Sequence, residues 1–171
     1  MREYADDPPV EETVGDALRD TGHTVATAES CTGGLIGSLL TDVPGSSDYF
    51  DRSYVTYAYD AKLDHGVTRE ALDDHGAVSE PVARQMARGV RDQAGTTWGV
   101  ATTGVAGPGG GSEETPVGTV FVGIAYAGDW GSGDSYATVA HREFDGDRLA
   151  VKEQIARAAL RLLEAEHESV T

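Results

Sequence analysis

Apolar residues recur at helical spacing in several segments of this chain. The first such segment has four apolar residues on one face and ends near Gly22, which predicts a helix over residues 10–21. Further helices are expected over 35–43, 68–75 and 79–94. The final helix is expected to bury Val151, Ile155, Ala158, Ala159 and Leu162.

Between these helices lie short runs of β-branched, small and aromatic residues, which predict strands. The expected strands are Thr24–Ala28, Ser53–Tyr59, Trp98–Val105, Val117–Ala127 and Ser135–Phe144, the last two forming a hairpin. Helices and strands alternate through the first hundred residues, so the pattern predicts an α/β fold: a three-layer α/β/α single domain with a mixed sheet. We place the domain at residues 8–167 and expect residues 1–7 to be a flexible acidic segment.

Composition limits the possible functions. The chain has 171 residues, one domain's length, and 29 acidic against 13 basic residues give it a net charge of −16. Such a surface argues against nucleic-acid binding, and the absence of a long apolar run argues against a membrane protein, so we expect a cytoplasmic protein. Only Lys62 and Lys152 are lysines. Few lysines with many acids suggest a halophilic source, the alternative being an unusually acidic mesophilic protein.

The segment Ala28-Glu29-Ser30-Cys31-Thr32-Gly33-Gly34 lies where a strand passes into a helix, at the sheet edge where α/β proteins bind ligands. Ser30 is a candidate nucleophile, with neighbouring N–H groups available to stabilise an oxyanion. The alternative is that Ser30 or Thr32 only caps the helix. Cys31 is a rival nucleophile, although a small buried side chain is the more common role for such a cysteine.

The segment Val55-Thr56-Tyr57-Ala58-Tyr59-Asp60-Ala61-Lys62 supplies a candidate base. A serine nucleophile needs one, and no His–Asp pair with suitable spacing is present, so we favour Lys62 made neutral by burial against the tyrosines. The alternative is a surface lysine paired with Asp60 or Asp64. By composition alone, Tyr57 and Tyr59 are packing residues.

The third candidate segment is the glycine-rich stretch from Gly104 to Ser112, which follows a predicted strand. Its backbone N–H groups can form an anion-binding nest for a phosphate or nucleotide, the alternative being a flexible surface loop. The five histidines have no metal-binding spacing, so we expect neither a metal nor an organic cofactor. Trp130 is interpreted as a packing or loop-anchoring residue.

These segments, in this order, resemble the CinA C-terminal domain family, the nicotinamide-nucleotide amidohydrolases. The resemblance rests on TVATAESCTGGLIGSLLTDVPGSSDYF, VTYAYDAK, HGAVSEPVARQMARG and TTGVAGPGGGSEETPVGTVFVGIA. It implies hydrolysis of nicotinamide mononucleotide to nicotinate mononucleotide and ammonia, a step of pyridine-nucleotide salvage. It also implies Ser30 as nucleophile, assisted by Tyr57 and Lys62. The substrate-binding residues predicted with it are Glu29, Thr32, Gly33, Gly34, Gly104, Ala106, Gly107, Pro108, Gly110, Gly111 and Ser112.

Two differences from the family pattern matter. The family typically has VTYSNEAK, whereas Ala58, Tyr59 and Asp60 alter this segment here. Full-length family members also have an N-terminal domain that resembles molybdopterin-binding proteins, and this chain lacks it, so its pyrophosphatase activity is not assigned. A catalytically silent nucleotide-binding or regulatory module remains an alternative function. Direct DNA handling conflicts with the charge, and a homo-oligomer is compatible with the family.

Overall fold

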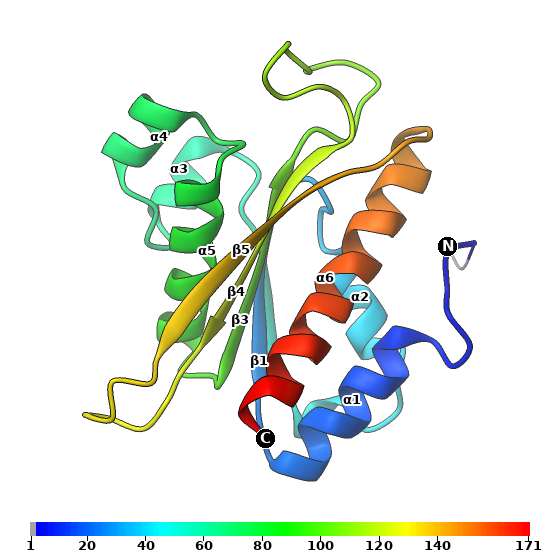
Figure 1. The fold of residues 1–171 in the computed structure, drawn as a ribbon, viewed down its shortest axis with the longest axis vertical. Coiled ribbons are helices and arrows are strands. Elements are labelled where there is room, and N and C mark those ends of the chain that lie inside the picture. Colours follow the sequence, from blue (N-terminus) through cyan, green and yellow to red (C-terminus); the bar gives the residue numbers. More distant parts are fainter. Residues whose placement is uncertain (1–2) are drawn as a thin grey trace.

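The computed structural model describes residues 3–171 and contains one mixed five-stranded sheet. Its strands are β1 (Val25–Glu29), β2 (Phe50–Val55), β3 (Trp98–Gly104), β4 (Thr119–Tyr126) and β5 (Tyr136–Glu143). They are ordered β2-β1-β3-β4-β5, with β1 parallel to β2 and β3, and with β4 antiparallel to both β3 and β5. The sheet twists through the centre of the molecule (Figure 1).

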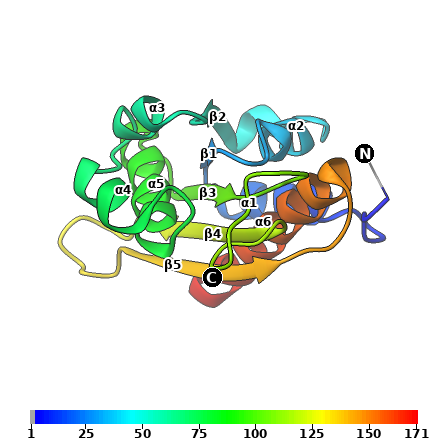
Figure 2. The same cartoon turned by 90° about the horizontal axis from the view of Figure 1, so that it is seen from above.

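Helices cover both faces of this sheet. The helices are α1 (Val10–Thr21), α2 (Leu35–Thr41), α3 (Tyr59–Leu63), α4 (Arg69–His75), α5 (Glu80–Ala94) and α6 (Arg148–Val170), with a 3-10 turn η1 (Ser46–Asp48). Viewed from above, α1, α2 and α6 lie on one side and α3, α4 and α5 on the other (Figure 2). The predicted three-layer α/β/α fold with a mixed sheet is confirmed.

Each layer contributes its own apolar core. Val14, Ile36 and Ile155 belong to the cluster between the sheet and α1, α2 and α6, while Val82 and Met86 of α5 pack against alanines on the opposite face. Small side chains on this second face let α5 lie close to the sheet: a Cβ at Gly99 or Gly123 would meet the α5 backbone. None of the helices in the described part of the chain is long and apolar enough to cross a membrane.

The strand predicted over Ser53–Tyr59 is wrong in its position. Strand β2 begins at Phe50 and ends at Val55, where its partner β1 ends at Glu29. The last ladder contact is the Thr56 N–H, which donates to the Glu29 carbonyl at 2.9 Å. Beyond it the chain turns away from the sheet and forms α3, so Lys62 lies on a short helix.

Candidate active site

The Lys62 side chain meets Ser30 where three neighbouring strands end at the same edge of the sheet. The Lys62 Nζ lies 3.0 Å from the Ser30 Oγ, although the residues are 32 positions apart. Lys62 is 1% exposed and Ser30 is 9% exposed. The same nitrogen donates to the carbonyl oxygens of Thr56 at 2.6 Å and Tyr57 at 3.3 Å. The first turn after β2 therefore holds the amine against the hydroxyl.

This arrangement suits a neutral amine. The Nζ atom has three hydrogen-bond partners, the Ser30 hydroxyl and the carbonyls of Thr56 and Tyr57; a neutral amine can give its two N–H donors to the carbonyls and its lone pair to the serine proton. Loss of solvent on burial lowers the pKa of Lys62 below its ordinary value. Within residues 3–171 no carboxylate lies in ion-pair range of Lys62. The surface-lysine alternative is therefore wrong.

Glu29 is fully buried, and its carboxylate accepts six hydrogen bonds. The Oε2 atom accepts from the Thr32 hydroxyl at 2.7 Å and from the N–H groups of Gly34 and Ile36 at 3.0 Å each. The Oε1 atom accepts from the Gly37 N–H at 2.8 Å, and the hydroxyls of Thr27 and Ser53 complete the set. A buried carboxylate with this many donors needs no cation.

The Glu29 carboxylate therefore occupies N–H groups that could otherwise bind an anionic ligand group. Its carboxylate satisfies the free N–H groups at the start of α2, where Gly33 and Gly34 adopt positive φ angles that favour glycine. We expected Glu29 to contact the substrate. In the structure its side chain is fully buried, and both carboxylate oxygens bind groups of the protein interior. The capping alternative for Ser30 and Thr32 is also wrong, because Glu29 caps the helix.

In the turn that carries Ser30, two backbone N–H groups have no oxygen acceptor within residues 3–171. The Ser30 N–H donates to the Thr102 carbonyl at 2.9 Å, and the Gly33 N–H closes the turn onto the Ser30 carbonyl at 3.2 Å. No oxygen atom of residues 3–171 accepts from the N–H groups of Cys31 and Thr32. These groups follow the hydroxyl directly, which is the usual position of an oxyanion hole.

The Cys31 thiol is buried, as we expected for a small core side chain. Burial raises its pKa to about 12, although a hydrogen bond from Thr102 opposes this. A thiol of such low acidity is a poor nucleophile. The geometry thus favours Ser30 over Cys31.

Tyr57 has two separate roles in the structure. Its carbonyl oxygen holds Lys62, while its ring is 63% exposed, and its hydroxyl lies 3.4 Å from a guanidinium nitrogen of Arg148. Tyr59 is also more than half exposed. The interpretation of both tyrosines as packing residues is therefore wrong. Lys62 is shielded from solvent by the backbone of Thr56 and Tyr57, to which its Nζ atom donates, and not by the tyrosine rings.

The glycine-rich loop lies beside this site, above the ends of β3 and β4 (Figure 1). Several predicted substrate-binding residues instead build the loop itself. A Cβ at Gly107 would lie 2.6 Å from the Val117 side chain, and one at Gly111 would lie 2.8 Å from the Val117 nitrogen. Ala106 packs in the core, and Gly104 is pressed against the Thr119 carbonyl. Pro108, Gly110 and Ser112 are exposed and remain placed to meet a ligand.

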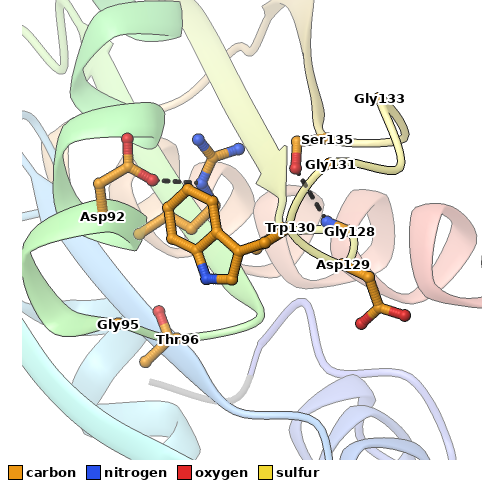
Figure 3. Close-up of a pocket in the computed structure, with 11 residues that line it drawn as sticks. Asp92, Gly95, Thr96, Gly128, Asp129, Trp130, Gly131, Gly133 and Ser135 are labelled. Carbon is orange, nitrogen blue, oxygen red and sulfur yellow. Dashed lines mark hydrogen bonds and ion pairs between the residues drawn. The ribbon is translucent and has the colours of Figure 1, made fainter.

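A cavity lies at the opposite end of the sheet. It encloses about 690 Å³ between the end of α5 and the β4–β5 hairpin, and Arg91, Thr96 and Trp130 are among its lining residues (Figure 3). Trp130 is fully exposed at the hairpin tip, so it does not anchor or pack the loop as we expected. Residues 3–171 contain no group of three or more His, Cys, Asp or Glu side chains that could hold a metal ion.

A model of the CinA C-terminal domain matches residues 7–167. The chain belongs to the CinA C-terminal domain family. It is 48% identical over 158 residues to a CinA-like protein of Chloroherpeton thalassium and 52% identical over 155 residues to one of Salinibacter ruber. These matches cover 92% and 90% of this chain but only 37% and 36% of those longer proteins.

Solved structures of the CinA family show the same fold. The competence/damage inducible protein CihA of Agrobacterium tumefaciens superposes with a TM-score of 0.84 at 40% identity, covering 91% of this chain and 92% of that one. A CinA superfamily protein of Enterobacter cloacae gives a TM-score of 0.86 at 29% identity, covering 98% and 95%. The resemblance seen in the sequence is thus confirmed at the level of the family.

The departures from the family pattern lie outside the contact between Ser30 and Lys62. Ala58, Tyr59 and Asp60 are all exposed, and the Ala58 carbonyl accepts the backbone N–H of Lys62 at 3.2 Å. Sequence reasoning missed Arg148 and Lys152 of α6, which reach this CinA-domain site from the far end of the chain. One signal in the sequence could have indicated Lys152: it is one of only two lysines in the chain, and the other is Lys62.

Proposed function

We propose that this chain hydrolyses a carboxamide, with Ser30 as nucleophile and Lys62 as general base. The observation that supports this most directly is the 3.0 Å contact between the buried Lys62 Nζ and the Ser30 Oγ. Burial lowers the pKa of Lys62, so the amine is neutral and able to accept the serine proton at a lower pH than an ordinary lysine.

In the first half of the reaction the amide is exchanged for an ester. The Ser30 Oγ attacks the carboxamide carbon while its proton passes to the Lys62 lone pair. The N–H groups of Cys31 and Thr32 stabilise the negative oxygen of the tetrahedral intermediate. Collapse of this intermediate breaks the C–N bond, and the departing nitrogen takes the proton from Lys62 and leaves as ammonia.

In the second half water replaces ammonia. Lys62, neutral again, removes a proton from a water molecule that attacks the ester carbon. The ester bond breaks, the proton returns to the Ser30 Oγ, and the carboxylic acid product leaves as a carboxylate. Tyr57 positions Lys62 through its carbonyl oxygen in both halves.

The substrate we propose is nicotinamide mononucleotide, which would yield nicotinate mononucleotide and ammonia. This choice follows from the family resemblance of the AESCTGG, VTY and glycine-rich segments. It is compatible with an open site edge where exposed residues of the glycine-rich loop stand beside the reacting pair. No step needs a metal or an organic cofactor.

The test is ammonia release from nicotinamide mononucleotide by the purified chain and three variants. Ser30→Ala and Lys62→Met should each abolish turnover, because they remove the nucleophile and the base. Cys31→Ala is the matched control, since it changes the neighbouring residue without touching either group, and it should retain activity.

Two results would contradict the proposal. Tight binding of nicotinamide mononucleotide without any turnover by the unchanged chain would favour the catalytically silent module. Turnover that survives Ser30→Ala but disappears in Cys31→Ala would instead make the thiol the nucleophile.

A further inference from the structure

Two cations of α6 face the catalytic turn. Arg148 and Lys152 are one helical turn apart, at the end of α6 nearest the glycine-rich loop (Figure 1). Arg148 donates to the Gly107 carbonyl of that loop and lies beside the Tyr57 hydroxyl. The Lys152 Nζ lies 3.6 Å from the position that a Cβ on Gly33 would occupy. Lys152 therefore borders the turn that carries Ser30, and Arg148 borders the neighbouring Tyr57 and glycine-rich segments.

Lys152 has no partner of its own. It is half-buried, and within residues 3–171 no hydrogen bond or ion pair reaches its Nζ. Acidic residues are abundant in a chain with a net charge of −16, but none of them pairs with Lys152 in the described part of the chain. Holding a partly desolvated, unpaired ammonium beside Arg148 costs free energy that an anion between them would recover.

Two other backbone features near the site are partly occupied. The N–H groups at the start of α2 are already bonded to Glu29. Gly107 and Gly111 of the glycine-rich loop pack against Val117. The cationic face of α6 supplies two charged side-chain donors near the catalytic turn, beside the exposed residues of the glycine-rich loop.

We propose that Lys152 and Arg148 form the subsite for a phosphate monoester on the substrate. Two positive charges match the two negative charges of such a group, with Arg148 supplying a planar fork and Lys152 a point charge. The Asp147 carboxylate accepts from the Leu149 and Ala150 N–H groups at the start of α6, so the attraction comes from the two side chains and not from the helix N-terminus. This inference rests on the proposed amide hydrolysis and adds that phosphate recognition comes from α6.

The experiment compares two amides that differ only in the phosphate, nicotinamide mononucleotide and nicotinamide riboside. Lys152→Gln should raise KM for the phosphorylated amide about tenfold or more and leave kcat within about twofold, since a lost charged hydrogen bond has that size. Its effect on the riboside should be negligible. Lys152→Arg should restore most of the affinity. Arg88→Gln, an exposed cation on α5, is the matched control for the loss of one charge.

A binding measurement separates this inference from the proposed function. In the Ser30→Ala background, calorimetry should show that Lys152→Gln weakens binding of the mononucleotide but not of the riboside, whether or not the unchanged chain is catalytic. Equal effects on both compounds, or no effect on either, would overturn the subsite. Absence of turnover by the unchanged chain, with binding still dependent on Lys152, would overturn the hydrolytic function alone.

Discussion

Replacing Glu29 by Gln tests the hydrogen-bond network that holds the Ser30 turn. The substitution keeps the size of the side chain but exchanges one acceptor oxygen for an NH2 group. All six contacts of the carboxylate come from donors, and three of these are backbone N–H groups that cannot reverse their direction. The hydroxyls of Thr27 and Ser53 can rotate to accept instead.

The least costly arrangement places the new NH2 at the Oε1 position. It then faces the Gly37 N–H and the two adaptable hydroxyls, and one buried N–H loses its acceptor. An unsatisfied buried donor costs about 1–3 kcal/mol, and the other bonds weaken because they lose the charge of the carboxylate. We expect the free energy of unfolding to fall by about 3 kcal/mol, which most domains survive.

Urea unfolding measures this change directly, and activity well below the unfolding temperature gives a second measurement. We expect kcat to fall more than KM rises, because the turn that carries Ser30 and the N–H groups of Cys31 and Thr32 is attached to the start of α2. Ser53→Ala is the control: it removes one hydroxyl donor and should cost about 1 kcal/mol. A loss below about 1 kcal/mol in Glu29→Gln would refute the reasoning.

Four further results are expected. The rate of amide hydrolysis should rise with pH through a pKa below the ordinary lysine value of about 10.4, because only neutral Lys62 accepts a proton, and Lys62→Arg should be inactive at every pH. The Cys31 thiol should resist alkylation in the folded chain at neutral pH, since burial raises its pKa to about 12, and rapid labelling would contradict this. Burial lowers the pKa of His23 and His167, so the unfolded chain binds their protons more readily than the folded chain. The free energy of unfolding should therefore be constant above about pH 6.5 and fall below it. The urea midpoint should fall with it at acidic pH, and this fall should be smaller in His167→Gln. The free energy of unfolding should increase between low and molar KCl as salt screens the net charge of −16, and a flat curve would remove the halophilic interpretation.

The layer order and the pairing of Ser30 with Lys62 could be predicted because they follow from local patterns. Helical and strand periodicities alternate in a way that allows few topologies, and the ends of neighbouring parallel strands meet at one edge. The contact requires that both segments leave adjacent parallel strands at one edge of the sheet, as they do after Glu29 and Val55. Lys62 follows Val55 closely in the chain, so its long side chain can return to the strand ends and meet Ser30.

The end of β2 could not be predicted because SYVTYAY has strand composition throughout. What ends the strand is its partner, since β1 passes into the Ser30 turn and offers no further ladder after Glu29. The carbonyls of Thr56 and Tyr57 are then taken by the Lys62 side chain. A long-range contact thus overrides a local preference.

The place of Arg148 and Lys152 could not be predicted for a different reason. Two cations one turn apart on a helix with as many acidic as basic residues have the pattern of a solvated face. Only the packing of α6 beside α2 brings them to a turn more than a hundred residues earlier in the chain. The rarity of lysine was the one clue in the sequence, and it was applied to Lys62 alone.

The burial of Glu29 explains how Lys62 can remain a base. A carboxylate in the same buried site would ordinarily draw the ammonium into an ion pair, which would raise the lysine pKa and keep it protonated. Here neutral donors occupy the Glu29 oxygens, from backbone N–H groups and hydroxyls, and the Lys62 amine meets only two carbonyls and a hydroxyl. The Glu29 charge therefore holds the turn through hydrogen bonds, and the loss of solvent on burial sets the direction in which the pKa of Lys62 shifts. A variant that frees one Glu29 oxygen toward Lys62 should accordingly move the pH profile upward as well as weaken the fold.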